Sequence, residues 1–295
     1  MTIRHSTTAL AGAVCLAAMP AAAQEEVDIG APQIDLDDTI FGGDFLTLGA
    51  GGALSPSYSG SDDYVINVLP LVLGSYGGVD VSPRAGGVTV DFIPDNDSGV
   101  SFDLGLAARI RRDRVNRIED PVVELYGELD TAVEVGPAIG VNFDGVLNPF
   151  DTVSIGADAL FDVAGAHQGY VISPGISYST PLSRSVLANL SVSTDWANEE
   201  FLDYYHAVVP INTVAPDPDA LPAFNPDGGG FRSVGANLLL GIDLDGNALN
   251  GGLGLVVIGG YSRLLGDAAD SPFTDIRGSR NQFLGGLGLT YTFGL

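Results

Sequence analysis

The chain has 295 residues and is strongly acidic, with 37 Asp and Glu residues against 12 basic residues and a formal net charge of −25. This balance argues against a nucleic-acid partner, because binding to phosphates needs a basic face. Hydrophobic residues make up 45% of the chain, yet no stretch beyond the N-terminus supplies the ~18 consecutive apolar residues of a membrane-spanning helix, so apolar residues are dispersed along the sequence.

Residues 1–23 have the composition of a secretory signal peptide. Arg4 lies near the start, residues 8–19 are apolar or small, and Ala21-Ala22-Ala23 supplies an A-x-A cleavage site. The single cysteine, Cys15, lies inside this segment, so we expect the exported chain to contain no disulfide bond. Residues 24–42 are acidic and have no strand periodicity, which predicts a periplasmic N-terminal tail.

From residue 43 to residue 295, apolar and small or polar residues alternate in one segment after another. In residues 98–111, for example, Phe102, Leu104 and Leu106 share one parity while Asp103 and Gly105 share the other. Such alternation predicts strands with one apolar face and one polar face. The predicted strands are 43–54, 62–75, 80–92, 98–111, 121–142, 150–163, 168–180, 184–196, 201–209, 230–244, 251–264 and 281–293. The alternative to twelve strands is ten, because 80–92 and 201–209 have the weakest patterns. The segment 210–230 predicts an external loop.

The last predicted strand, residues 281–293, is the most informative of these segments. Its apolar parity ends in Tyr291 and Phe293, and its other parity carries Gly286, Gly288 and Thr290. A closing strand of this kind is typical of bacterial outer-membrane barrels. We therefore predict an all-β fold, a transmembrane antiparallel up-and-down β-barrel over residues 43–295. Its apolar face would contact the lipid and lipopolysaccharide of a Gram-negative outer membrane, and both termini would be periplasmic.

Charged residues cluster on the inner parity of two neighbouring predicted strands. The strand 98–111 carries Arg109 and Arg111, and the strand 121–142 carries four carboxylates of one parity. These carboxylates are Glu124, Glu128, Asp130 and Glu134. Because charge on a lipid-facing position is unfavourable, all six side chains are expected in the lumen. They indicate either a constriction that selects ions or a salt-bridged plug that fills a narrow barrel.

Catalytic residues are not apparent in the sequence. His167 and His206 are the histidines that remain after the predicted signal peptide, and no G-x-S-x-G element accompanies them. They do not have the spacing of a metal-ligand pair. We therefore expect no enzyme, no catalytic residue, no metal and no cofactor, and a lipid hydrolase is disfavoured.

Several distinctive motifs remain: Leu48-Gly49-Ala50-Gly51, Pro56-Ser57-Tyr58-Ser59-Gly60-Ser61-Asp62-Asp63-Tyr64, Leu69-Pro70, Trp196-Ala197 with Tyr204-Tyr205, and the block from Tyr261 to Pro272. These motifs are similar to those of the MipA/OmpV family of MltA-interacting outer-membrane proteins. The resemblance implies a non-catalytic barrel that acts as a scaffold between a murein transglycosylase and a murein synthase. The alternative that the residues themselves suggest is a small cation-preferring channel, because acids exceed bases.

Overall fold

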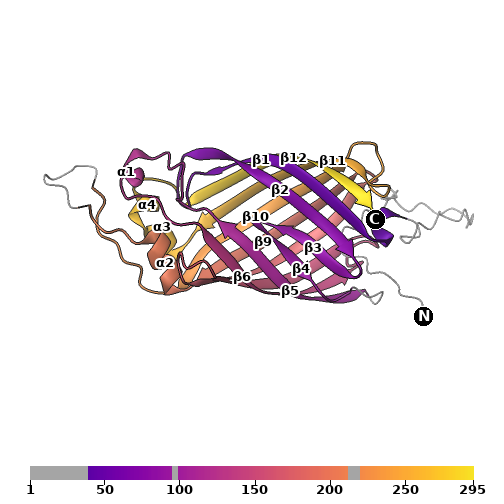
Figure 1. Cartoon of the computed structure of the whole chain (residues 1–295), viewed down its shortest axis with the longest axis horizontal. Helices are drawn as coiled ribbons and strands as arrows, with labels where there is room; N and C mark the ends of the chain where they lie inside the picture. The colour runs from indigo at the N-terminus through magenta and orange to yellow at the C-terminus, as the bar shows by residue number, and fades with distance from the viewer. Residues whose placement is uncertain (1–38, 95–98, 212–219) are drawn as a thin grey trace, which may run out of the picture.

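Twelve antiparallel strands close into one barrel within residues 39–94, 99–211 and 220–295, which the computed structural model describes (Figure 1). This confirms the predicted fold class and strand number. The predicted signal peptide and most of the predicted acidic tail lie outside the described residues.

The strands are β1 (Phe45–Pro56), β2 (Tyr64–Tyr76), β3 (Val79–Arg84), β4 (Gly87–Asp91), β5 (Val100–Arg111), β6 (Ala132–Asp144), β7 (Thr152–Asp162), β8 (Tyr170–Ser183), β9 (Val186–Ala197), β10 (Gly230–Asp243), β11 (Gly252–Leu264) and β12 (Asn281–Gly294). The helices are α1 (Pro121–Glu124), α2 (Glu199–His206), α3 (Gly266–Asp270) and α4 (Pro272–Asp275), with a 3₁₀ turn at Ile40–Gly42.

Each strand pairs with the next one along the chain, and β1 pairs with β12 to close the barrel. The closing ladder runs from Phe45 opposite Gly294 to Leu54 opposite Gly285. This is up-and-down connectivity. Closure leaves no terminal strand with an unpaired edge, which a lipid environment requires.

The two faces of the strands follow the predicted parity. Leu104 is 52% exposed on the outer face of β5, whereas Asp103 accepts a hydrogen bond from the Asn142 side chain at 2.8 Å on the inner face. The exposed residues of β12 include Phe283, Leu287 and Phe293. An apolar outer surface and a polar lumen are the arrangement expected in a bilayer.

Three predicted segments differ from the structure. The segment 80–92 forms two short strands, β3 and β4, because a turn at Ala85-Gly86 reverses the chain and Gly86 has a φ of 76°. The segment 121–142 is a strand only from Ala132 onward. The segment 201–209 is not a strand, because residues 199–206 form the helix α2. One strand gained and one lost leave the total at twelve.

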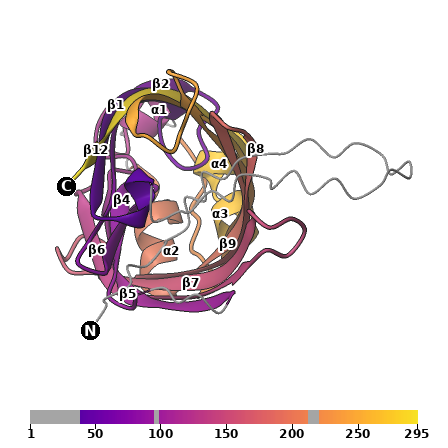
Figure 2. The ribbon, with the colours of Figure 1, turned by 90° about the vertical axis from the view of Figure 1, so that its right-hand side faces the viewer.

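The four helices gather at one end of the barrel, and both described termini lie at the other (Figure 1). We call these the helix end and the terminus end. Viewed along the barrel, α2 lies inside the ring of strands (Figure 2). Among the described residues, no helix is long and apolar enough to cross a membrane.

Two apolar clusters pack at the helix end. One joins Val171 and Ala197 of the wall to Phe201, Leu202 and Tyr205 of α2. The other joins the loops that connect strands. Its buried members are Tyr58, Val122, Val123, Val208, Leu221 and Phe273. These clusters anchor the loops and α2 to the barrel, since burial of apolar surface is the main stabilising term.

Candidate functional site: a charged layer beneath helix α2

Helix α2 places an aromatic ring across the bore. Asn198 precedes the helix, and Glu199 and Glu200 lie in its first turn, where negative charge favours helix formation. The Phe201 side chain is fully buried, and its ring centroid lies 4.8 Å from Cζ of Arg111 on β5 and 5.1 Å from Cζ of Arg232 on β10. Since β5 and β10 are five strands apart in the barrel order, the ring spans the space between distant walls.

Glu134 lies at the centre of the charged residues below this ring. Its side chain has no exposed area, and it accepts hydrogen bonds from Nε of Arg109 and, at 2.9 Å, from Nε of Arg111. His167 Nε2 lies 3.1 Å from the same carboxylate. Because the Gly169 amide donates to His167 Nδ1 at 3.1 Å, His167 Nε2 carries the hydrogen that is donated to Glu134.

A second ion pair continues the network to the other wall. Arg232 Nη1 lies 3.1 Å from an oxygen of Asp195 on β9, and the Ser173 hydroxyl donates to Asp195 at 2.8 Å. Arg232 Nη2 donates to the Ser59 hydroxyl at 3.1 Å, which joins the β1–β2 loop to the barrel wall.

We call Arg109, Arg111, Glu134, His167, Asp195 and Arg232 the charged layer. Its three arginines face two carboxylates, so every carboxylate is paired. Removing one partner of such a buried pair is strongly destabilising, because the remaining charge stays desolvated. The layer therefore holds α2 and the β7–β8 loop in one arrangement and crosses the bore at this level.

The structure brings together three of the six predicted lumen charges. Arg109 of β5 is directly opposite Glu134 of β6 in the ladder, and Arg111 contacts the same carboxylate. Their common placement was predicted from parity.

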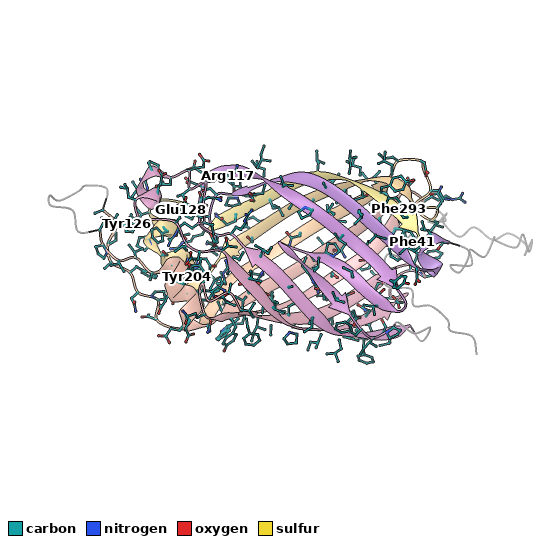
Figure 3. The ribbon with its side chains drawn as sticks, viewed as in Figure 1. Phe41, Arg117, Tyr126, Glu128, Tyr204 and Phe293 are labelled. Carbon is teal, nitrogen blue, oxygen red and sulfur yellow. The ribbon has the colours of Figure 1, made fainter. Side chains whose placement is uncertain are left out.

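The other three predicted charges lie elsewhere. Glu124 ends helix α1, Glu128 and Asp130 lie in the loop that follows it, and all three are exposed. Figure 3 shows Glu128 at the helix end. The prediction that one strand carries all four carboxylates is wrong. Asp120 caps α1 by accepting hydrogen bonds from two backbone amides, and Pro121 occupies the first helical turn, so the alternating pattern here is not that of a strand.

Three members of the charged layer were not predicted. His167 is in a loop, and nothing in its neighbourhood predicts a contact with Glu134. Asp195 has the inner parity of its strand and could have been found by comparing charges between distant strands. Arg232 has the outer parity by simple counting, but a β-bulge between Phe231 and Ser233 turns it inward.

Two further polar side chains are buried at the helix end, outside the strands. The Tyr58 hydroxyl donates to the Phe273 carbonyl at 3.3 Å, and burial, with the nearby Asp120, raises the pKa of Tyr58. His206 is fully buried in α2, and neither ring nitrogen has a hydrogen-bond partner among the described residues. Burial, with Arg232 and the other nearby guanidinium groups, holds the pKa of His206 well below its usual value.

Comparison with solved structures gives distant likenesses. An outer-membrane channel from Pseudomonas putida F1 is 10% identical, with a TM-score of 0.43, and the alignment covers 85% of this chain and 96% of that one. CymD, a monoaromatic hydrocarbon channel, is 11% identical with a TM-score of 0.37, covering 86% and 90%. The toluene transporter TbuX from Ralstonia pickettii is 7% identical with a TM-score of 0.35, also covering 86% and 90%. No curated protein matches the chain.

A family comparison is more specific. The family described as "MltA-interacting protein MipA" matches residues 48–293, which span the barrel from β1 to the end of β12. The match includes the motifs on which the sequence resemblance rests. The chain belongs to the MltA-interacting protein MipA family, and it is a β-barrel protein of the outer membrane.

Proposed function

We propose that this protein is a non-catalytic scaffold of the outer membrane that binds a murein transglycosylase and, through it, a murein synthase. The observation that carries this proposal is the filled bore. Phe201 and the charged layer occupy the lumen beneath the helix end, as in a barrel that serves as an anchor rather than a pore. The family description, which names interaction with MltA, supports the choice of partner.

The proposed docking surface is the terminus end, facing the periplasm. The β6–β7 turn there is held by Asp151, whose carboxylate accepts hydrogen bonds from the amides of Val146, Leu147 and Asn148. This turn presents Leu147, which is 76% exposed, at the same end of the barrel as the exposed Asp245 of the β10–β11 turn. A rigid apolar tip with an exposed carboxylate at the same end suits a partner surface that combines an apolar pocket with basic residues.

Site-specific crosslinking in the native envelope tests this proposal. A photoreactive amino acid at Leu147 is expected to capture the transglycosylase. The matched control is the same substitution at Val209, which is 79% exposed in the loop after α2. Capture from Val209 instead of Leu147 would reverse the proposed orientation, and the absence of murein enzymes from both would contradict the scaffold.

The second candidate is the cation-preferring channel. It is favoured by a luminal pocket between β3 and β6 that includes three carboxylates, Asp80, Asp91 and Asp103. A channel function would require α2 to leave the bore, and conductance in planar bilayers with and without α2 tests it.

A further inference from the structure

The ladder of the barrel is incomplete beside β2. From Tyr64 to Ser75, β2 pairs with β1 on one side. On its other side β2 pairs with β3 only at Gly74, Ser75 and Tyr76. Among the described residues, no strand pairs with that side of β2 between Tyr64 and Leu73, because the β3–β4 hairpin turns back at Ala85-Gly86 (Figure 1).

Proline residues lie on both borders of this interruption. The Ile66 carbonyl points away from β1, because it accepts a hydrogen bond from Arg117 Nη1 at 2.7 Å rather than from a strand. Pro70 is four residues further along β2, so its nitrogen points to the same side, where it has no proton to donate. Pro83 lies on β3 beyond the last pair with β2. Proline within strands is confined to such edges and to bulges.

Side chains around the interruption are unusually accessible. On the outer face of β2, Ile66 is 66% exposed and Val68 is 80% exposed, compared with 52% for Leu104 on the fully paired strand β5. The difference is expected where no neighbouring strand covers one flank. The outer face of β2 is therefore accessible to the bilayer at this point.

The inner face of β2 is apolar, in contrast to the luminal pocket beside β3. Leu69, Leu71 and Leu73 are opposite Gly51, Gly49 and Thr47 of β1, whose side of the strand faces the lumen. Leu71 lies along the wall as far as β12, because a Cβ atom on Gly288 would be only 3.2 Å from its Cδ1. These glycines leave room for a strip of leucine side chains inside the barrel.

Two arginines lie beside the interruption. Arg117, at the helix end of β2, holds the Ile66 carbonyl. Arg84, at the tip of the β3–β4 hairpin, has a half-exposed side chain that reaches inward to Thr89 and is paired with Asp158 of β7. The border thus supplies apolar surface along β2 and a cationic group, Arg117, at its helix end.

We propose that the wall has a lateral opening between β2 and the β3–β4 hairpin, through which the acyl chain of an anionic membrane amphiphile enters the lumen and lies on Leu69, Leu71 and Leu73. The bilayer supplies this ligand directly at Val68. The negatively charged head would lie near Arg117, where a guanidinium group favours a carboxylate or phosphate. This binding site is independent of the proposed scaffold function at the terminus end.

The backbone of β2 gives a physical reason for an occupant. Polar backbone groups without partners are unfavourable in hydrocarbon, by several kcal/mol each. Replacing a donor by Pro70 removes one of them, and Arg117 satisfies another. An amphiphile whose head and associated water reach the unpaired side of β2 would form hydrogen bonds with the remaining backbone groups there. A purely apolar molecule would not.

Photolabelling from the membrane tests the opening. Purified full-length protein is reconstituted in vesicles that contain a fatty acid with a diazirine on its acyl chain, irradiated, and digested for mass spectrometry. We expect labels on the inner-face residues Leu69, Leu71 and Leu73, in addition to outer-face residues such as Leu104. Labels on outer-face residues alone would show a closed wall and overturn the proposal.

Matched variants separate binding from general effects on the barrel. Leu71→Asn places an amide in the leucine strip and is expected to reduce labelling of Leu69 and Leu73 about tenfold, given the apolar area lost. Leu239→Asn changes a leucine on the inner face of β10, on another part of the wall, and should leave that labelling unchanged. Equal effects of the two variants would contradict the site. Both variants are first checked for heat-modifiable migration on gels, which reports an assembled barrel.

A second copy of the chain is the competing occupant of the open edge. If β2 pairs with β2 of another molecule, Ile66→Cys should form disulfide-linked dimers in vesicles, and inner-face labelling should be absent. That combination would overturn the proposal. A monomeric Ile66→Cys protein with labelled leucines supports it.

Discussion

Glu134 is the residue on which the charged layer depends, because one carboxylate contacts two arginines and a histidine. Arg109 and Arg111 come from the neighbouring strand, and His167 comes from the β7–β8 loop. The carboxylate therefore links wall and loop as well as neutralising charge. Among the described residues, Arg109, Arg111 and His167 each form an ion pair with Glu134 and with no other carboxylate, so they depend on it.

Substitution of this residue tests that dependence. Glu134→Gln is expected to lower the free energy of unfolding by about 3–5 kcal/mol, because Arg109 and Arg111 would remain buried without a counter-charge. The measurement is urea-induced unfolding of the barrel in detergent or vesicles. Glu128→Gln is the control, since Glu128 is exposed at the helix end and its change should stay within about 0.5 kcal/mol. Similar losses in the two variants would refute the central role of Glu134.

At the scale of elements, the stability of the docked helix α2 depends on pH through His206. The pKa of this buried ring is held well below its usual value by burial and by Arg232, Arg114 and Arg111. When α2 leaves its site, the ring meets water and regains an ordinary pKa of about 6.5. Below that pH the released form binds a proton that the docked form does not. The stability of the docked helix therefore falls on acidification, with a slope approaching about 1.4 kcal/mol per pH unit.

Hydrogen exchange of the α2 amides measures this effect. We expect protection of residues 199–206, corrected for intrinsic rates, to decrease between pH 7.5 and pH 5, while protection of β12 stays constant. In His206→Leu the decrease should disappear, because no group in α2 then gains a proton on release. A pH dependence that persists in His206→Leu would assign the effect to another group.

The same elements mark what the sequence could and could not predict. Strands such as β5 and β12 were predicted because alternation is a local property that a bilayer and a wet lumen impose on every residue. Helices α1 and α2 were predicted as parts of strands because their residues continue the alternation by coincidence. Asp120-Pro121 and Asn198-Glu199-Glu200 are helix-start signals that outweigh it. The contact of His167 with Glu134 depends on loop geometry, and the inward turn of Arg232 depends on a bulge, so neither follows from parity.

At the scale of the whole molecule, the filled bore predicts electrical behaviour. Wild-type protein in planar bilayers should show no steady conductance, because α2 and the charged layer occupy the lumen. Replacing Glu199–His206 by a Gly/Ser linker of equal length should open it. The open form should prefer cations at low salt, owing to Asp80, Asp91 and Asp103, and lose this preference at high salt.

The same linker replacement in residues 245–250, at the terminus end, is the control and should leave the bilayer silent. Steady cation-selective steps from wild-type protein would favour the channel over the scaffold. Anion preference in the opened form would instead show that the three arginines of the charged layer determine the ion selectivity of the lumen.

The interrupted ladder beside β2 also has a mechanical consequence. A tube whose wall is hydrogen-bonded all the way round resists flattening, whereas a tube slit along part of its length bends at the slit. Here the helix end is stiffened by packed loops, and the three pairs at Gly74–Tyr76 join the slit edges at the terminus end. Lateral pressure from the surrounding lipid therefore acts on a cross-section that yields most readily beside β2, where the described ladder has its longest interruption. We therefore expect the distance between β2 and the β3–β4 hairpin to change with bilayer thickness and tension.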